Sequence, residues 1–143
     1  MKTLAIRKLH LTIILGCLTM TSAWGQKASM QFDKMQIAQT DQNYQPIERT
    51  SKTKQQSGTI QIFKDEIRII QSNTSNYQKF TITKYRKLSD RYEFAATNSD
   101  GNWAFSLWKQ NGQNIFMALW IDQQIISVFN ISSGFTLDIP FLK

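Results

Sequence analysis

Apolar and polar residues alternate along most of the chain after residue 27, and short polar joints interrupt the alternation. The clearest stretch runs from Arg91 to Ile131, where four apolar runs are separated by joints that include Asp100-Gly101 and Asn111-Gly112. Alternation with a period of two is typical of strands that bury one face. Asp-Gly and Asn-Gly pairs favour the positive φ of tight hairpins. This stretch therefore predicts an antiparallel meander.

The same alternation predicts strands on both sides of the meander. Their ranges are 28–37, with a bulge near Asp33-Lys34, then 59–63, 66–70 and 77–86, and finally 135–139. Lys64-Asp65 is short enough for a tight hairpin. Residues 40–57 are polar and predict a long loop with at most a helical turn around Pro46–Arg49. The fold class is all-β: an antiparallel up-and-down meander of about eight or nine strands, closed into a barrel or strongly curved.

Aromatic residues of the meander, together with Met117, form two candidate sets. One set is assigned to the face that points inward, where it would line a cavity for a small apolar ligand: Tyr92, Phe94, Trp103, Phe105 and Met117. The other set is assigned to the opposite face, as an exposed interaction strip: Trp108, Phe116 and Trp120. Ordinary core packing on one face with partial cover of the other explains the same residues without a ligand, so both interpretations stay open.

The first 25 residues have the composition of a secretory signal peptide. Lys2, Arg7 and Lys8 form a basic start, and an apolar run follows over 9–20. Ala23-Trp24-Gly25 places small residues before a cleavage point at Gln26. The apolar run is too short to span a bilayer as a helix. We therefore expect a secreted or periplasmic protein whose residues 26–143 form a single β-meander domain without a transmembrane span.

Cys17 offers an alternative to export as a soluble chain, namely anchorage through a lipid on this residue. It follows Gly16, as the modified cysteine of a bacterial lipoprotein signal does. However, the preceding pair Ile14-Leu15 suits that signal badly, and the cysteine lies inside the apolar run rather than at its end. We therefore expect cleavage before Gln26 and keep lipid anchorage through Cys17 as the alternative.

Removal of the signal also removes much reactive chemistry. His10 and Cys17 are the only histidine and cysteine of the chain. A chain that begins at Gln26 has no disulfide, no thiol nucleophile, no histidine general base and no zinc site of the usual nitrogen–sulfur type. Paired carboxylates would remain as an enzymatic alternative, but most aspartates fall in predicted turns. We expect a protein that is not an enzyme and uses no catalytic residue, metal or cofactor.

The charge of the chain is mildly basic once the signal is set aside. Residues 1–25 hold three of the 17 basic residues and none of the 10 acidic ones, which leaves 14 against 10 and a net charge of +4. The densest basic cluster runs from Lys84 to Lys87, with Arg91 nearby. A solvated strand end explains it, and an anionic contact such as a polysaccharide or lipid head group is the alternative. No nucleic-acid partner is expected, because no fold signature accompanies the cluster.

Several hairpin sequences resemble a known group of proteins. The run GTIQIFKDEIRI at 58–69, followed by YEF, DG and WAFSL between 92 and 107, resembles small secreted lipocalin-like β-meander proteins of Gram-negative bacteria over most of residues 28–131. The resemblance implies a lipocalin-like barrel, without the G-x-W signature of true lipocalins, and carries over no site residues. The expected function is binding of a small apolar ligand, and a module that contacts a protein partner or the cell surface is the alternative.

Overall fold

The computed structural model describes residues 27–74, 76–133 and 139–142. It contains a short 3-10 helix, η1 (Glu48–Thr50), and antiparallel strands that form one sheet. The strands are β1 (Ala28–Gln39), β2 (Lys52–Lys54), β3 (Gly58–Ile62), β4 (Glu66–Gln71), β5 (Tyr77–Lys87), β6 (Arg91–Asn98), β7 (Gly101–Gln110), β8 (Gln113–Trp120) and β9 (Ile125–Ser133).

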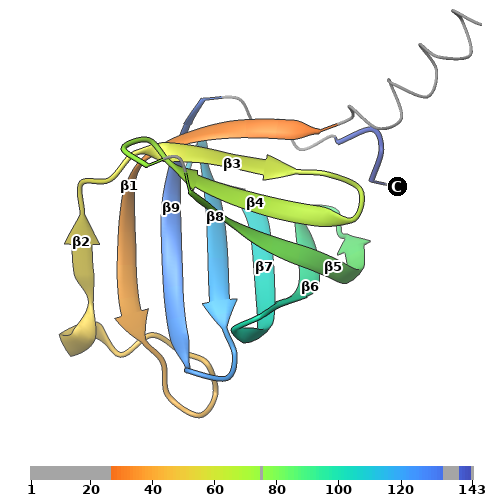
Figure 1. Ribbon diagram of the computed structural model, residues 1–143. Helices are drawn as coiled ribbons and strands as arrows, with labels where there is room; N and C mark the ends of the chain where they lie inside the picture. The colour runs from red at the N-terminus through yellow and green to blue at the C-terminus, as the bar shows by residue number, and fades with distance from the viewer. Residues whose placement is uncertain (1–26, 75, 134–138, 143) are drawn as a thin grey trace, which may run out of the picture.

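The sheet closes on itself as an eight-stranded barrel with β2 as an additional strand (Figure 1). Each strand from β3 to β8 pairs with the next in sequence, and β9 then pairs with β1 from Gln31↔Ser133 to Gln39↔Ile125. Closure satisfies the backbone groups that the two end strands of an open meander would leave unpaired. The predicted all-β antiparallel barrel is thereby confirmed.

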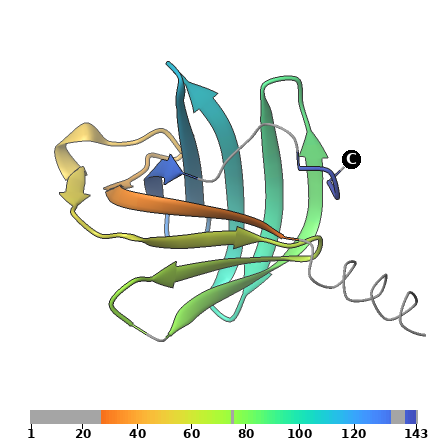
Figure 2. The same ribbon diagram turned by 90° about the horizontal axis from the view of Figure 1, so that it is seen from above.

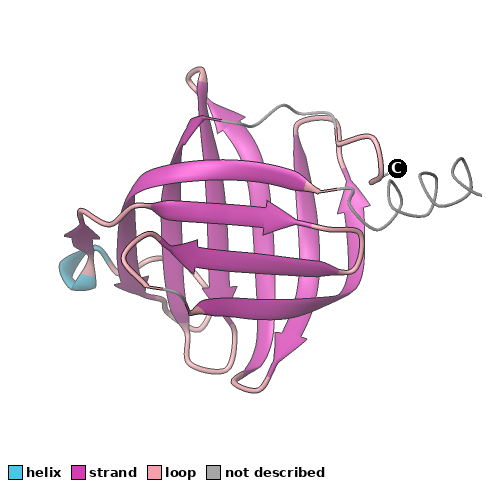
Figure 3. Cartoon of the chain, turned by 45° about the horizontal axis from the view of Figure 1, so that its top comes forward, coloured by secondary structure: helices cyan, strands magenta, loops and turns pink. Residues whose placement is uncertain are grey.

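The barrel is flattened into two walls whose strands run across each other (Figure 3). One wall contains β3, β4 and the first parts of β1 and β5, and the other contains β6 to β9. Both long strands that pass between the walls change register where they turn: β1 between Phe32 and Lys34, and β5 between Ile82 and Lys84. Such bulges bend a strand sharply, and the first confirms the irregularity predicted near Asp33-Lys34.

Glycine is needed at Gly58, where β3 begins beside the bulge of β1. A Cβ at this position would lie 2.2 Å from the carbonyl oxygen of Ile70 and 2.6 Å from the Phe32 ring. Neither neighbour has room to retreat, because Phe32 is only 2% exposed and the oxygen belongs to the backbone. The corner of the barrel is therefore closed by close contact between a strand backbone and a core ring.

The interior of the barrel is filled by aromatic and branched side chains. Phe80 contacts both Trp103 and Phe105 edge to face with 4.9 Å between ring centroids, and Phe105 stacks on Phe116 at 5.5 Å. From there Phe116 reaches Phe129 at 6.0 Å, and Phe129 meets Phe32 at 4.8 Å. This row of rings joins the two walls and leaves the middle of the barrel packed.

The C-terminal segment plugs one end of this core. Ile139 and Leu142 are 3% and 0% exposed and belong to the same buried cluster as the barrel interior. The backbone N–H of Ile139 donates a buried hydrogen bond of 2.8 Å to the hydroxyl of Tyr92. Residues 139–142 lie beside β5 and β6 in the view from above (Figure 2). The strand predicted for 135–139 falls mostly outside the described residues.

Residues 40–57 are less irregular than the predicted loop. η1 coincides with the helical turn expected near Pro46–Arg49, but Lys52–Lys54 pairs with β1 as β2. The reason is that β3 pairs only with 28–32 of β1, so the edge of β1 at Met35–Ile37 is open to another strand. The side chain of Asp41 orders the preceding turn by accepting hydrogen bonds from the N–H groups of Asn43 and Gln45.

The predicted signal peptide at 1–25 and the alternative at Cys17 lie outside the described residues. Within the described ranges, no helix has the length and hydrophobicity that crossing a membrane requires.

Candidate functional site

A pocket of about 290 Å³ opens at the end of the barrel away from the C-terminal plug. Tyr92, which contacts the plug, pairs with Leu107 near one end of the β6–β7 hairpin, whereas Trp103 pairs with Ala96 near the other. Six strands contribute to the lining, which includes Met35, Ile37, Ile69, Gln71, Gln78, Trp103, Ala118, Trp120, Ile125, Ser127 and Phe129. The volume lies just below the usual range for small-molecule sites, roughly 300–1,000 Å³.

Two stacked tryptophans form one wall of this pocket. Trp103 of β7 and Trp120 of β8 are direct cross-strand partners. Their rings lie 5.1 Å apart between centroids with an interplanar angle of 11°. Trp103 is also held from the core side by the edge of Phe80. The pair therefore presents a broad apolar surface that is already in place before any ligand arrives.

Both indole nitrogens are occupied by the turn between β6 and β7. Nε1 of Trp103 donates to Oδ1 of Asn98 at 3.0 Å, and Nε1 of Trp120 donates to the carbonyl oxygen of Asp100 at 3.0 Å. Oδ1 of Asn98 also accepts the N–H of Asp100 at 2.9 Å, so one amide oxygen orders both the turn and a ring. The indoles thus offer a ligand their faces rather than their N–H donors.

The turn itself is tied to the next hairpin by Asp122. Its Oδ2 accepts the backbone N–H of Asn102 at 2.7 Å, and the N–H of Ile121 donates to the carbonyl oxygen of Asn102 at 3.0 Å. Gly101 has a φ of +121°, and a Cβ there would lie 1.9 Å from Oδ2 of Asp122. The absence of a side chain at Gly101 therefore allows the carboxylate to approach and hold the mouth in shape.

The polar part of the lining comes from Gln71, Gln78 and Ser127. Gln71 ends β4 and Gln78 follows the start of β5, so both lie beside the joint between these strands. Ser127 faces inward from β9, opposite Ile37 on one side and Ala118 on the other. A few amide and hydroxyl groups around an apolar wall are a common arrangement in sites that orient small ligands.

The structure divides the predicted cavity residues into three groups. Trp103 lines the pocket at the mouth. Tyr92, Phe94 and Phe105 point inward as expected, but they are 1–3% exposed and fill the core rather than line this pocket. The inward assignment of Met117 needs correction: it packs on the outside of the barrel with Val128, Leu119 and other residues of a separate apolar cluster.

The predicted interaction strip is also divided. Phe116 is completely buried in the core, and Trp120 stacks inside the mouth, so neither lies on the outer surface with Trp108. The correction has a simple cause. Every residue from Ile115 to Trp120 is apolar, and alternation therefore cannot distinguish the two faces of β8. The two-residue turn at Asn111-Gly112 decides which face of β8 points inward, because it pairs Gln110 with Gln113 and hence Leu107 with Phe116.

The sequence argument missed the three polar residues of the pocket. Gln71 and Gln78 lie at strand ends, where a polar residue is ordinary and carries no signal. Ser127 was detectable, because it interrupts the inward series of β9 that continues through Phe129 and Ile131. A polar residue at an inward position is a sign that the interior is not uniformly packed there.

The chemistry of the described residues is sparse. They contain no group of three or more histidine, cysteine, aspartate or glutamate side chains that could hold a metal ion. Several carboxylates already have partners: Glu66 pairs with Arg68, Glu93 with Arg86 and Arg91, and Asp122 with a backbone N–H.

No family model, no curated protein and no solved structure matches the chain. The lipocalin-like resemblance therefore stays a prediction.

Proposed function

We propose that this chain is a binding protein that holds a small, mainly apolar ligand in the pocket at the barrel mouth. The observation that carries the proposal is the stack of Trp103 on Trp120 beside the pocket opening. A binding surface whose rings are fixed in advance loses little conformational entropy on binding, so more of the contact energy becomes affinity. The hydrogen bonds to Asn98 and Asp100 supply that fixation.

The lining suggests the kind of ligand. A volume of about 290 Å³ suits a single ring system or a short chain rather than a long lipid. The ring faces and the side chains of Met35, Ile37 and Phe129 favour an apolar body. The amides of Gln71 and Gln78 favour one neutral hydrogen-bonding group on that body, because no charged side chain is among the lining residues.

We propose that the pocket binds its ligand without transforming it. The pocket lining contains no acid, base or nucleophile stronger than the Ser127 hydroxyl, and a serine needs a base to act as a nucleophile.

We further propose that the protein is exported, cleaved before Gln26 and active outside the cytoplasm. The basic start, the apolar run and the Ala23-Trp24-Gly25 segment support export.

Mass spectrometry of the protein isolated from its own source tests both parts of the proposal. The denatured mass should correspond to a chain beginning at Gln26, whereas a lipid-modified Cys17 would contradict cleavage there. The native spectrum should contain an additional noncovalent mass in a ratio of one per chain that disappears on denaturation. A native mass equal to the denatured mass, in protein that also fails to bind an apolar probe, would overturn the ligand proposal.

A further inference from the structure

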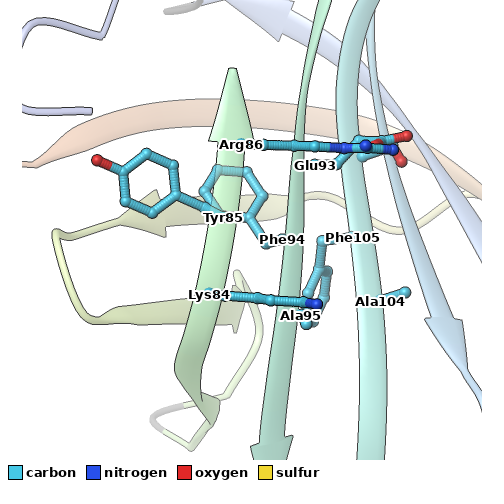
Figure 4. Close-up of a pocket in the computed structure, with 9 residues that line it drawn as sticks. Lys84, Tyr85, Arg86, Glu93, Phe94, Ala95, Ala104 and Phe105 are labelled. Atoms are coloured by element: carbon cyan, nitrogen blue, oxygen red, sulfur yellow. The ribbon is translucent and has the colours of Figure 1, made fainter. Parts of the chain in front are cut away.

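A second hollow lies on the outer wall of the barrel, over β5, β6 and β7 (Figure 4). It has a volume of about 490 Å³ and continues into an adjoining hollow of about 370 Å³, with Ser106 in the lining of both. The second part brings in Asp90, Arg91, Trp108 and Met117. Together they form a groove that crosses four strands and is separate from the pocket at the mouth.

Small outward residues create this groove. Ala95 pairs with Ala104 across β6 and β7, and Ser106 lies between Glu93 and Met117. Long side chains border these positions: Lys84 and Arg86 extend outward from β5, while Tyr85 points to the opposite side of the strand (Figure 4). The floor therefore carries methyl groups and one hydroxyl, whereas the rim carries long cationic side chains.

The rim is cationic even after its internal ion pairs are counted. Arg86 contacts Oε1 of Glu93 through Nη2 at 2.6 Å, and Nε of Arg91 donates to Oε2 of the same carboxylate at 3.0 Å. Nη1 of Arg91 also lies 3.6 Å from Oδ2 of Asp90, which lines the adjoining hollow. Lys84, Arg86 and Arg91 therefore face two carboxylates, Glu93 and Asp90, which leaves a net charge of +1 on the rim. No carboxylate lies within ion-pair distance of Lys84 among the described residues. The Arg86 side chain is 68% exposed, so its remaining N–H groups are accessible.

We propose that this outer groove binds an acidic, partly apolar segment of another protein. Carboxylates of the partner would contact Lys84 and Arg86, and an apolar side chain of the same segment would pack on Ala95, Ala104 and Met117. The contact is made by side chains alone, because β6 and β7 are paired on both edges and leave no backbone groups for strand addition.

Charge and shape favour an acidic protein segment over a second copy of this chain, a small ligand or a membrane surface. A second copy would present the same cationic rim, and like charges repel. A small ligand would remain largely in solvent in a groove on the outer wall, whereas small-molecule sites bury most of their ligand. A membrane surface contacts protruding apolar residues, but the apolar residues here form the floor of a concavity.

The test uses two defined peptides and backbone amide NMR. The acidic peptide acetyl-DLDFDLD-amide should cause saturable shifts at Lys84, Ala95, Ala104 and Ser106 in the full exported chain. Its uncharged analogue acetyl-NLNFNLN-amide should bind at least about fivefold more weakly, because it keeps the apolar contacts and loses the charge pairing. The Trp103 and Trp120 signals should not shift, which separates this site from the mouth.

Two charge-reversal variants complete the test. Lys84→Glu should weaken the acidic peptide roughly tenfold, whereas Lys109→Glu, an equal change at an exposed position of β7 outside the groove, should alter affinity less than about twofold. Equal losses in both variants, equal binding of the two peptides or shifts spread over the whole surface would overturn the proposal. Sedimentation with phosphatidylglycerol vesicles that Lys84→Glu abolishes, without any peptide shift, would also overturn it and assign the groove to a lipid surface.

Discussion

Trp103 and Trp120 lie stacked at the barrel mouth, 5.1 Å apart between centroids and 11° from parallel, and both indole N–H groups donate to the same β-turn. The register of the β7–β8 hairpin places the rings side by side, and the turn at Asn98–Asp100 fixes how they are rotated. A wall of the pocket is therefore built from local sequence signals alone: one hairpin turn sets the pairing and another sets the orientation.

Asn98→Ala should loosen this wall without unfolding the barrel. The substitution removes the acceptor for Nε1 of Trp103 and for the N–H of Asp100. We expect a loss of about 1–2 kcal/mol in the free energy of unfolding and weaker binding of an apolar probe. Denaturant unfolding and probe titration measure the two effects. Asn102→Ala is the control, since the Asn102 backbone rather than its side chain is bonded to Asp122; equal losses in both variants would contradict the role given to Asn98.

Phe116 and Met117 provide a direct test of which face of β8 is inside. Phe116 is 0% exposed in the ring stack of the core, while Met117 packs on the outer surface. Phe116→Ala should cost about 3–5 kcal/mol in unfolding free energy, as expected for a truncated core ring. Met117→Ala should cost clearly less, about 1 kcal/mol. The opposite order in denaturant unfolding would show that the strand is registered the other way.

The hydrogen bond between Tyr92 and Ile139 should hold the C-terminal plug in place. Tyr92→Phe keeps the ring but leaves the buried N–H of Ile139 without its acceptor. The expected cost to the docking of the C-terminal plug is about 1–3 kcal/mol. It should be seen as local opening of this segment before it is seen as global unfolding. Hydrogen exchange should accelerate at Ile139 and Leu142 while the amides of β7 and β8 keep their protection. Unchanged exchange at Ile139 would show that the hydrogen bond contributes nothing to docking.

Glu93 should make the stability of the barrel depend on pH at the acid end. The pKa of its carboxyl lies below the ordinary value of 4.5, because the Arg86 side chain donates to the carboxylate, with a further bond from Arg91. A carboxyl with a lowered folded-state pKa stabilises the fold above its unfolded value and loses that contribution as the pH falls through the folded value. The effect is small, below about 1 kcal/mol, because the groups are partly exposed.

Glu93→Gln and Arg86→Gln should both reveal this contribution in unfolding free energies measured from pH 7 to pH 2. The difference between wild type and either variant should be largest at neutral pH and shrink toward zero below the ordinary carboxyl value. A difference that stays constant over the whole range would mean that packing rather than ionisation causes the loss.

The sequence predicts the fold much more clearly than the site. Alternation and the Asn111-Gly112 and Lys64-Asp65 turns predict the hairpins, because strand pairing between neighbours in sequence is a local property. The bulge of β1 was visible as a change of parity between Phe32 and Met35. Closure through β1 and β9 was less accessible, since it joins the two ends of the chain and depends on the summed twist of every strand.

The pocket depends on information that strand patterns lack. Trp103 was recognised from its inward position, but Phe94 and Phe105 have the same pattern and are core residues. Which inward residue borders a cavity is decided by where along the barrel it lies, and this follows from the stagger of all the strands. Residues such as Gln71 and Gln78 come together only through the closed topology.

A fluorescence titration with N-phenyl-1-naphthylamine, an uncharged apolar dye, tests the mouth pocket most directly. Two serines of central strands provide matched variants: Ser127 faces the pocket and Ser106 faces outward into the groove. We predict saturable binding with a dissociation constant on the order of 10 μM. Ser127→Leu should weaken it at least about tenfold by filling the pocket, and Ser106→Leu should leave it unchanged. Absence of saturable binding, or unchanged binding by a folded Ser127→Leu protein, would contradict a ligand site at the barrel mouth.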